Sequence, residues 1–261
     1  MQPERNPINL NRIPLAEAAK VKLSLMQQID YPETSTHILY DPQIYTGDPG
    51  LLFARERIIG STSAQGPHAS VVFLSGERED YAWKRFRRRG LMAHLCREHY
   101  GWRPLPETRM WREFHILSEL WRAGLPVPRP VAARCRYLRP LFYTGDLITL
   151  RLEGAVNLRD LLRRDALEAR IWIEIGRVIG ALHRHSVRHG DLNATNILVK
   201  TEGAVHVVDF DKSIYEKGPS IWKARNLSRL HASLTKLSGR YDPFYFEEAD
   251  WARVLEGYKS A

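Results

Sequence analysis

Two polar segments in the second half of the chain, held at a fixed spacing, constrain its fold more than any other feature. Residues 189–196 read HGDLNATN, and residues 207–211 read VVDFD. Asn196 follows Asp191 by five residues, and Asp209 follows Asn196 by thirteen. Thirteen residues leave room for two short strands and their turn. Chance rarely produces both spacings, so we expect the three side chains to meet at one site.

These side chains are the types that phosphoryl transfer requires. One carboxylate must lie beside the attacking hydroxyl, and a second carboxylate with an amide must hold the metal ions that bridge the nucleotide phosphates. The separation of five equals that between the Asp and the Asn of the protein-kinase catalytic loop. We therefore predict Asp191 as the catalytic residue, and Asn196 and Asp209 as ligands of Mg²⁺ beside ATP. The alternatives are purely structural roles: a turn residue for Asp191 and a strand-end cap for Asp209.

Residues upstream supply the other parts of a nucleotide site. A strand at 81–86 places Lys84 where a kinase needs a cation to orient the phosphates. Glu113 follows 29 residues later, in a helix expected over 108–120, and is predicted to pair with Lys84. In that helix a stripe at helical spacing is expected to face the core. Its members are Trp111, Phe114, Leu117 and Leu120.

Hydrophobic periodicity predicts an α+β chain with two lobes. We expect an N-terminal extension over 1–50, an antiparallel-sheet lobe with one helix over 51–153, and a mainly helical lobe over 154–261. The extension contains one weakly amphipathic stretch at 15–29. Further strands are expected at 51–59, 70–74, 131–136 and 147–152, and further helices at 158–163, 167–185, 227–236 and 250–258. The small polar segment 60–66 is read either as a cover for phosphates or as a plain turn.

Composition excludes several classes of protein. The 261 residues are 44% apolar, which is ordinary for a chain that buries a core, so disorder throughout is not expected. No signal peptide and no run of about 18 apolar residues is present, so we expect neither export nor a membrane span. The two cysteines, Cys96 and Cys135, have no metal-ligand spacing and are expected to be inert packing residues. The net charge of +9 points to an anionic partner.

The chain resembles the protein-kinase-like superfamily over roughly residues 51–260, on Lys84, Glu113, the 189–196 loop and the 209–211 segment. Within it, four stretches are similar to the 3-deoxy-D-manno-octulosonic acid (Kdo) kinases of Gram-negative bacteria. The stretches read VPRPVAA at 127–133, HGDLNATNIL at 189–198, DFDK at 209–212 and NLSRL at 226–230. The resemblance implies transfer of the ATP γ-phosphate to the 4-hydroxyl of Kdo on a lipid A precursor. It also implies peripheral attachment to the cytoplasmic face of the inner membrane.

Two departures from protein kinases favour a substrate other than a protein, and a third adds a carboxylate near the expected metal site. Gly190 stands where protein kinases have an Arg, so the cation that grips a phosphorylated activation loop is missing. About a dozen residues separate Asp211 from the next expected helix, which is too little chain for a peptide platform. Asp211 itself replaces the usual Gly, and either assists metal coordination or caps a turn. His189 is expected to pack under the loop rather than to transfer protons.

A basic run, KRFRRRG at 84–90, continues through His94, Arg97 and Arg103. We interpret it as a surface for a phosphorylated glycolipid and an anionic membrane, against the alternative of a plain solvated face. No nucleic-acid motif accompanies it, so nucleic acid is not an expected partner. Trp83, Trp102, Trp111 and Trp121 are expected to be core or interface anchors rather than platforms for a sugar.

Two further functional classes stay open. One keeps the kinase chemistry but changes the acceptor to a lipopolysaccharide heptose or a soluble small molecule such as an aminoglycoside. The excess of Lys and Arg disfavours a polycationic acceptor of that last kind. The other class is a pseudokinase that binds nucleotide without catalysis, which the presence of all five functional residues disfavours.

Overall fold

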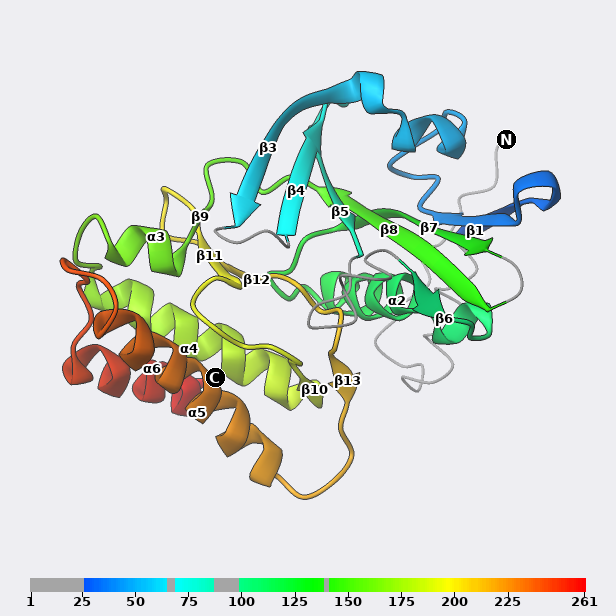
Figure 1. Ribbon diagram of the computed structural model, residues 1–261. Helices are drawn as coiled ribbons and strands as arrows, with labels where there is room; N and C mark the ends of the chain where they lie inside the picture. The colour runs from blue at the N-terminus through cyan, green and yellow to red at the C-terminus, as the bar shows by residue number, and fades with distance from the viewer. Residues whose placement is uncertain (1–25, 65–68, 87–98, 139–140) are drawn as a thin grey trace, which may run out of the picture.

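The computed structural model describes residues 26–64, 69–86, 99–138 and 141–261. Cys96, residues 87–98 of the basic run and most of the stretch expected to be helical at 15–29 lie outside these ranges. Figure 1 shows a twisted sheet on one side of the molecule and a group of helices on the other. The expected α+β architecture, with one sheet lobe and one helical lobe, is therefore confirmed.

The large sheet is antiparallel throughout its described strands. Their order is β1-β2-β7-β8-β5-β4-β3, and β6 pairs with β8 on the side. The bounds are Gln27–Tyr31 (β1), Thr36–Tyr40 (β2), Ile58–Ala64 (β3), Ala69–Leu74 (β4), Tyr81–Arg85 (β5), Tyr100–Gly101 (β6), Pro130–Leu138 (β7) and Phe142–Leu150 (β8). The strands expected at 70–74, 81–86, 131–136 and 147–152 are confirmed within a few residues.

The expectation of a loosely held extension over 1–50 is wrong for its described second part. β1 and β2 form a hairpin, and β2 pairs with β7 from Thr36↔Arg136 to Tyr40↔Ala132. Ile38, Leu39 and Tyr40 are buried there. The apolar run of β2 is short and stands among Pro, Asp and Thr, so only its partner strand shows that it belongs to the sheet. We propose that the sheet lobe begins at β1.

The strand expected at 51–59 is also wrong over most of its length. Two 3₁₀ helices occupy this region, Pro49–Phe53 and Arg55–Arg57, and strand structure begins only at Ile58. Asp48 caps the first of them by accepting a hydrogen bond from the Gly50 N–H (2.8 Å), and Pro49 fixes φ at its first position. The segment covers the outer face of the sheet, where Leu52 and Phe53 pack with Trp83 and Ile148.

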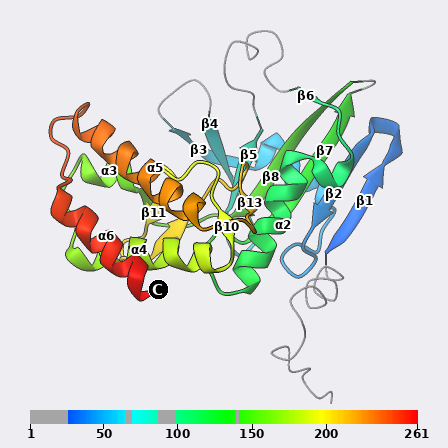
Figure 2. The ribbon, with the colours of Figure 1, turned by 90° about the horizontal axis from the view of Figure 1, so that it is seen from below.

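The inner face of the sheet packs on helix α2, Arg109–Arg122, as Figure 2 shows from below. The expected stripe of Trp111, Phe114, Leu117 and Leu120 is at most 3% exposed. Cys135 is fully buried beside this helix, and burial raises the pKa of its thiol to about 12, so it is an inert packing residue as expected.

The second lobe is mainly helical, as expected. Its helices are Leu158–Leu162 (α3), Ala169–Arg184 (α4), Ile221–Ser238 (α5) and Glu248–Ser260 (α6), and its short strands are Val156–Asn157 (β9), Val187–Arg188 (β10), Ile197–Val199 (β11), Val205–Val207 (β12) and Ile214–Tyr215 (β13). β11 and β12 are the two short strands predicted between Asn196 and Asp209. Helices α4 and α6 can cross closely because Gly176 and Gly257 have no side chain at the crossing. A Cβ at Gly176 would overlap the Val254 carbonyl oxygen, and one at Gly257 would overlap that of Ile173.

None of the helices in the described ranges combines the length and the apolar character needed to cross a bilayer.

Candidate active site

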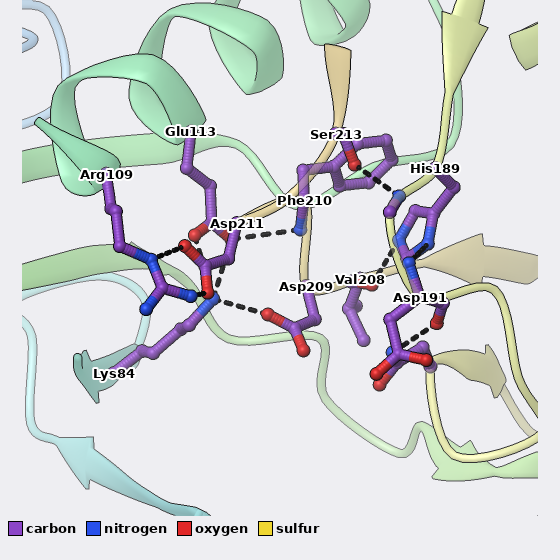
Figure 3. Close-up of polar contacts among 12 residues, drawn as sticks. Lys84, Arg109, Glu113, His189, Asp191, Val208, Asp209, Phe210, Asp211 and Ser213 are labelled. Atoms are coloured by element: carbon purple, nitrogen blue, oxygen red, sulfur yellow. Dashed lines mark hydrogen bonds and ion pairs between the residues drawn. The ribbon is translucent and has the colours of Figure 1, made fainter. Parts of the chain in front are cut away.

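Lys84 is the centre of the site on the sheet side. It lies in β5 between Val71 of β4 and Leu147 of β8. Its Nζ donates hydrogen bonds to both carboxylate oxygens of Glu113 (3.0 and 2.8 Å) and to Oδ1 of Asp209 (2.5 Å), as Figure 3 shows. Burial acts to lower the pKa of Lys84, but the two carboxylates outweigh it and hold this pKa above its usual value. The predicted pairing of Lys84 with Glu113 is therefore present, and Asp209 joins it.

Glu113 connects α2 to the segment that carries Asp209. The Glu113 side chain is only 2% exposed, and its Oε1 also accepts a hydrogen bond from the Phe210 backbone N–H (3.0 Å). A buried carboxylate is costly unless it is paired and hydrogen-bonded, and Glu113 has both kinds of partner. It therefore holds the Lys84 ammonium and the Phe210 backbone in fixed positions relative to each other.

Asp209 adopts a strained backbone conformation. Its φ is +67°, in the left-handed region that few residues other than Gly occupy. Such conformations cost on the order of 1 kcal/mol or more and cluster at functional sites. The turn directs the Asp209 carboxylate toward Lys84 while the next residue, Phe210, is fully buried.

Asp211 makes a contact that neither of its two expected roles included. Its carboxylate pairs with the guanidinium of Arg109, whose Nε lies 2.5 Å from Oδ1 and whose Nη2 contacts Oδ2. Arg109 stands four residues before Glu113 on α2, so the two side chains leave the same face of the helix. Both bind the 209–211 segment, which fastens α2 to it at two points (Figure 3).

Asp191 lies in the loop between β10 and β11. Its backbone carbonyl accepts hydrogen bonds from the side-chain amides of Asn193 (3.0 Å) and Asn196 (2.8 Å), which shape the loop. Its carboxylate Oδ1 accepts from Nε and Nη2 of Arg229 on α5 (3.0 and 2.5 Å). Burial acts to raise the pKa of Asp191, but the hydrogen bonds from Arg229 and Asn193 outweigh it and lower this pKa. The carboxylate is therefore ionised at neutral pH, and it is a weak base.

His189 packs under the loop as expected. It is 2% exposed, and its ring meets Phe210 edge-on at 4.9 Å. Nδ1 accepts from the Asp191 N–H (3.2 Å), so Nε2 carries the proton that bonds the Val208 carbonyl (3.0 Å). Burial lowers the pKa of His189, in agreement with a neutral ring. Both ring nitrogens are used to join the two polar segments.

The close approach of another segment explains why residue 190 is glycine, apart from the cation that is missing there. A Cβ at this position would overlap the backbone carbonyl of Lys212. The Gly190 N–H donates to the Ser213 hydroxyl (3.3 Å) in the same close approach. The residues after Asp211 therefore occupy the space that a larger side chain at position 190 would need.

Asn226 on α5 holds the start of the loop. Its Nδ2 donates to the His189 carbonyl (2.8 Å), so its Oδ1 is the acceptor for the His189 N–H (3.2 Å) and for His183 Nε2 (3.1 Å). His183 therefore carries its proton on Nε2 and accepts from the Tyr258 hydroxyl through Nδ1 (2.9 Å). Through this series of hydrogen bonds, helices α4, α5 and α6 all support the loop at 189–196.

The lowered pKa of His183 leads us to expect that the folded protein loses stability in mild acid. Burial lowers this pKa to about 4, below the value of about 6.5 in an unfolded chain. As pH falls, the unfolded chain binds the proton first, so this contribution is complete above pH 6.5 and is lost down to about pH 4. We expect the free energy of unfolding to decrease by about 3 kcal/mol across this window. Urea unfolding at several pH values measures it.

The matched control is His183→Gln, which keeps a donor and an acceptor but does not titrate. It should flatten most of the decrease between pH 6.5 and 4, leaving the part due to His115, His189 and His206, whose pKa values burial also lowers. An unchanged decrease in the variant would show that His183 is not its source.

The described residues fit nucleotide with Mg²⁺ rather than a metal held by protein alone. Among them, no group of three or more His, Cys, Asp and Glu side chains could hold a metal ion. Mg²⁺ in kinases needs only one or two protein ligands besides phosphate oxygens and water. Asn196 directs its Nδ2 to the Asp191 carbonyl, which leaves the amide oxygen as its cation-binding end. Asn196 and Asp209 thus form a suitable donor set.

Sequence reasoning gave no role to three contributors: Arg109, and also Asn226 and Arg229, which lie in the NLSRL stretch that carries part of the family resemblance. Arg109 could have been predicted from the sequence, because it stands one helical turn before Glu113 and therefore on the same face of the helix. Asn226 and Arg229 stand three residues apart on α5, so they share a face. Nothing in the sequence shows that this face meets the loop at 189–196.

The described Lys and Arg residues of the basic run pair with carboxylates of this protein. Lys84 is bound in the site, and Arg85 pairs with Asp146 (3.2 Å), whose side chain is 7% exposed. Arg103 is exposed and pairs with Glu107. Of the expected aromatic anchors, Trp83 and Trp111 are buried, whereas Trp102 and Trp121 are 58% and 39% exposed.

Known proteins resemble this chain over most of its length. Residues 53–258 match the Lipopolysaccharide kinase (Kdo/WaaP) family. A relative from Photobacterium profundum, named 3-deoxy-D-manno-octulosonic acid kinase, is 36% identical over 228 residues, covering 85% of this chain and 94% of the relative. One of the same name from Haemophilus influenzae is 38% identical, covering 78% and 86%. The solved structure titled "WaaP in complex with acyl carrier protein" aligns over 90% of both chains with a TM-score of 0.52 and 18% identity, which bears on the fold alone.

Proposed function

The chain belongs to the lipopolysaccharide kinase (Kdo/WaaP) family, and we propose from this premise that it is a Kdo kinase that phosphorylates the 4-hydroxyl of Kdo on a lipid A precursor. It is a phosphotransferase with an alcohol group as acceptor. The observation that carries the mechanism is the joining of Lys84, Glu113 and Asp209 beside the loop that holds Asp191 (Figure 3).

Each residue has a distinct part in the proposed reaction. Lys84, fixed by Glu113, orients the α and β phosphates of ATP. Asn196 and Asp209 hold Mg²⁺, which neutralises charge on the phosphate oxygens when bound. Asp191 holds the sugar hydroxyl in line with the γ-phosphate and accepts its proton late in transfer. The transition state of phosphoryl transfer is loose, so a carboxylate with a lowered pKa suffices for this part.

The direct test is an acceptor screen that locates the phosphate. Purified protein with Mg²⁺ and ATP is offered a Kdo-bearing lipid A precursor, a heptose-bearing acceptor and a soluble aminoglycoside, and each product is mapped by mass spectrometry. We expect phosphate on the Kdo 4-hydroxyl alone. Phosphate on heptose or on the aminoglycoside would replace the proposed acceptor. Transfer to none of them, with ATP still bound, would favour the pseudokinase alternative.

We further propose peripheral attachment to the cytoplasmic face of the inner membrane. The acceptor is a lipid, the chain carries a net charge of +9, and each basic residue near an anionic surface adds about 1 kcal/mol of attraction. Replacing Arg87, Arg88 and Arg89 by Ser should therefore weaken binding to anionic vesicles up to about 100-fold, most strongly at low salt. Co-sedimentation with vesicles measures this. Equal binding by the wild type and the variant would contradict this use of the basic run.

A further inference from the structure

A cavity of about 640 Å³ opens beside Asp191, between α5, α3 and the catalytic loop. This volume is in the range of pockets that hold small ligands. One end is formed by Asp191 and Arg229, and the other by Lys236, Arg240 and Tyr241. A group bound here reaches the carboxylate assigned to the acceptor hydroxyl, so the cavity lies where an acceptor must enter.

One face of α5 supplies most of the wall. Arg229, Ser233 and Lys236 recur at helical spacing, while Leu230 and Leu234 are fully buried on the opposite side; Arg240 joins the wall from the turn after the helix. At 1.5 Å per residue, Lys236 lies about 10 Å from Arg229 along the axis of α5, and Arg240 follows just beyond the end of the helix. Ala232 and Ser233 are small, so the wall is hollow between the basic side chains. The basic residues thus form a row leading away from Asp191.

The row carries an excess of positive charge. Asp191 is the one carboxylate among the residues that line the cavity, against four Arg and Lys side chains. Arg159 is held by Asp160 (2.8 Å), and Arg229 by Asp191, yet the Arg229 side chain remains 55% exposed. Lys236 and Arg240 are exposed, and within the described ranges no salt bridge with a carboxylate is found for either. The guanidinium groups of Arg163 and Arg240 lie 4.4 and 5.5 Å from the centroid of the Tyr241 ring, which places cation–π contacts at the far end.

We propose that this row binds the anionic groups of the acceptor, with Arg229 binding the carboxylate of the reacting sugar. The inference rests on the proposed function, which supplies a sugar acid as acceptor. In Kdo the carboxylate is attached to ring carbon C2 and the proposed accepting hydroxyl to C4, so a single ring carbon separates the carbons that carry them. A hydroxyl held by Asp191 therefore brings the carboxylate next to Arg229, which Asp191 contacts at 2.5 and 3.0 Å.

Arg229 suits this task because its guanidinium has five N–H donors, and Asp191 uses donors on Nε and Nη2 only. The donors that remain can form charge-assisted hydrogen bonds with a second carboxylate. Lys236 and Arg240, farther along the row, bind the next anionic group, a phosphate of the lipid A part. The same face repels polycations, which agrees with an acidic acceptor.

The test separates the two anions by changing the acceptor. Kinetics are measured with the Kdo-lipid A precursor, with the same acceptor after reduction of the Kdo carboxylate to an alcohol, and with the acceptor freed of its lipid A phosphates. Arg229→Gln should raise the KM for the intact acceptor about 10- to 100-fold and leave the KM for ATP unchanged. On the reduced acceptor, Arg229→Gln and the wild type should have similar KM values.

The far end is tested with Lys236→Gln and Arg240→Gln, alone and together. Each should raise the acceptor KM several-fold while kcat holds, and this effect should vanish on the phosphate-free acceptor. Lys259→Gln is the matched control, because Lys259 is an exposed lysine in the last turn of α6 as Lys236 is in the last turn of α5. It should leave every constant unchanged.

The outcomes distinguish the inference from the function on which it rests. If the wild type does not phosphorylate Kdo, the function fails and the inference with it. If the wild type does, but Arg229→Gln lowers kcat equally on the intact and reduced acceptors with unchanged KM, then Arg229 only positions Asp191. Normal KM values in the Lys236 and Arg240 variants would remove the far end from the site. Thermal melting of every variant excludes misfolding as the cause.

Discussion

Asp191→Asn is expected to lower kcat by about 10³-fold or more while ATP binding is retained. Removing a positioned acid–base group typically costs 10²- to 10⁴-fold, and here the carboxylate also holds the acceptor oxygen in line with the γ-phosphate. In the proposed arrangement ATP is held by Lys84, Asn196 and Asp209 rather than by Asp191. Initial rates of phosphate transfer to the Kdo-lipid A precursor and titration with Mg²⁺-ATP measure the two properties separately.

The matched control for this substitution is Asp165→Asn. Asp165 is an exposed carboxylate in the same lobe that accepts a hydrogen bond from the Ala166 N–H (2.7 Å) and is not among the residues that line the cavity beside Asp191. It should keep full activity. Substantial turnover by Asp191→Asn would show that this carboxylate does not act on the acceptor, whereas lost ATP binding would mean that the loop itself has been disturbed.

Lys84→Met is expected to abolish most activity and to destabilise the fold as well. It removes the cation from Glu113, whose carboxylate is 2% exposed, and from Asp209. Breaking a buried ion pair typically costs 3–5 kcal/mol; because 26% of the Lys84 side chain is exposed, we expect about 2–4 kcal/mol. Loss of one charge-stabilising contact to the reacting phosphates should lower kcat/KM on the order of 10²- to 10³-fold.

The double variant Lys84→Met/Glu113→Gln separates the two effects. A neutral amide still accepts a hydrogen bond from the Phe210 N–H but carries no unpaired charge. Urea unfolding should therefore show that most of the lost stability returns, while activity stays low. A double variant as unstable as Lys84→Met would show that the loss of the Lys84–Asp209 ion pair, rather than the unpaired charge on Glu113, causes the instability. Normal turnover in either variant would contradict the assignment of Lys84 to the phosphates.

Sequence reasoning succeeded where spacing alone dictates proximity. The thirteen residues between Asn196 and Asp209 accommodate β11 and β12, and this hairpin brings its two ends together in any fold that forms it. The core stripe of α2 was equally predictable, because helical geometry places Trp111 and Phe114 on one side of the helix whatever covers them.

It failed where a segment depends on a distant partner. Residues 51–57 read as a strand, but Asp48 and Pro49 start a 3₁₀ helix that covers the outer face of the sheet. β2 belongs to the sheet only because β7, some 95 residues later, offers it a free edge. Local pattern contains no information about that edge, so the described part of the extension was misjudged.

By itself the sequence predicted the residues of the proposed site: Lys84, Glu113, Asp191, Asn196 and Asp209 were each identified from residue type and spacing. The tertiary structure alone decided what surrounds them. Only the docking of α5 against the loop brings Arg229 to Asp191, and only the approach of α2 brings Arg109 to Asp211. The physical reason is that spacing along a chain controls local geometry, whereas the charge around a catalytic carboxylate depends on which helix faces pack against it.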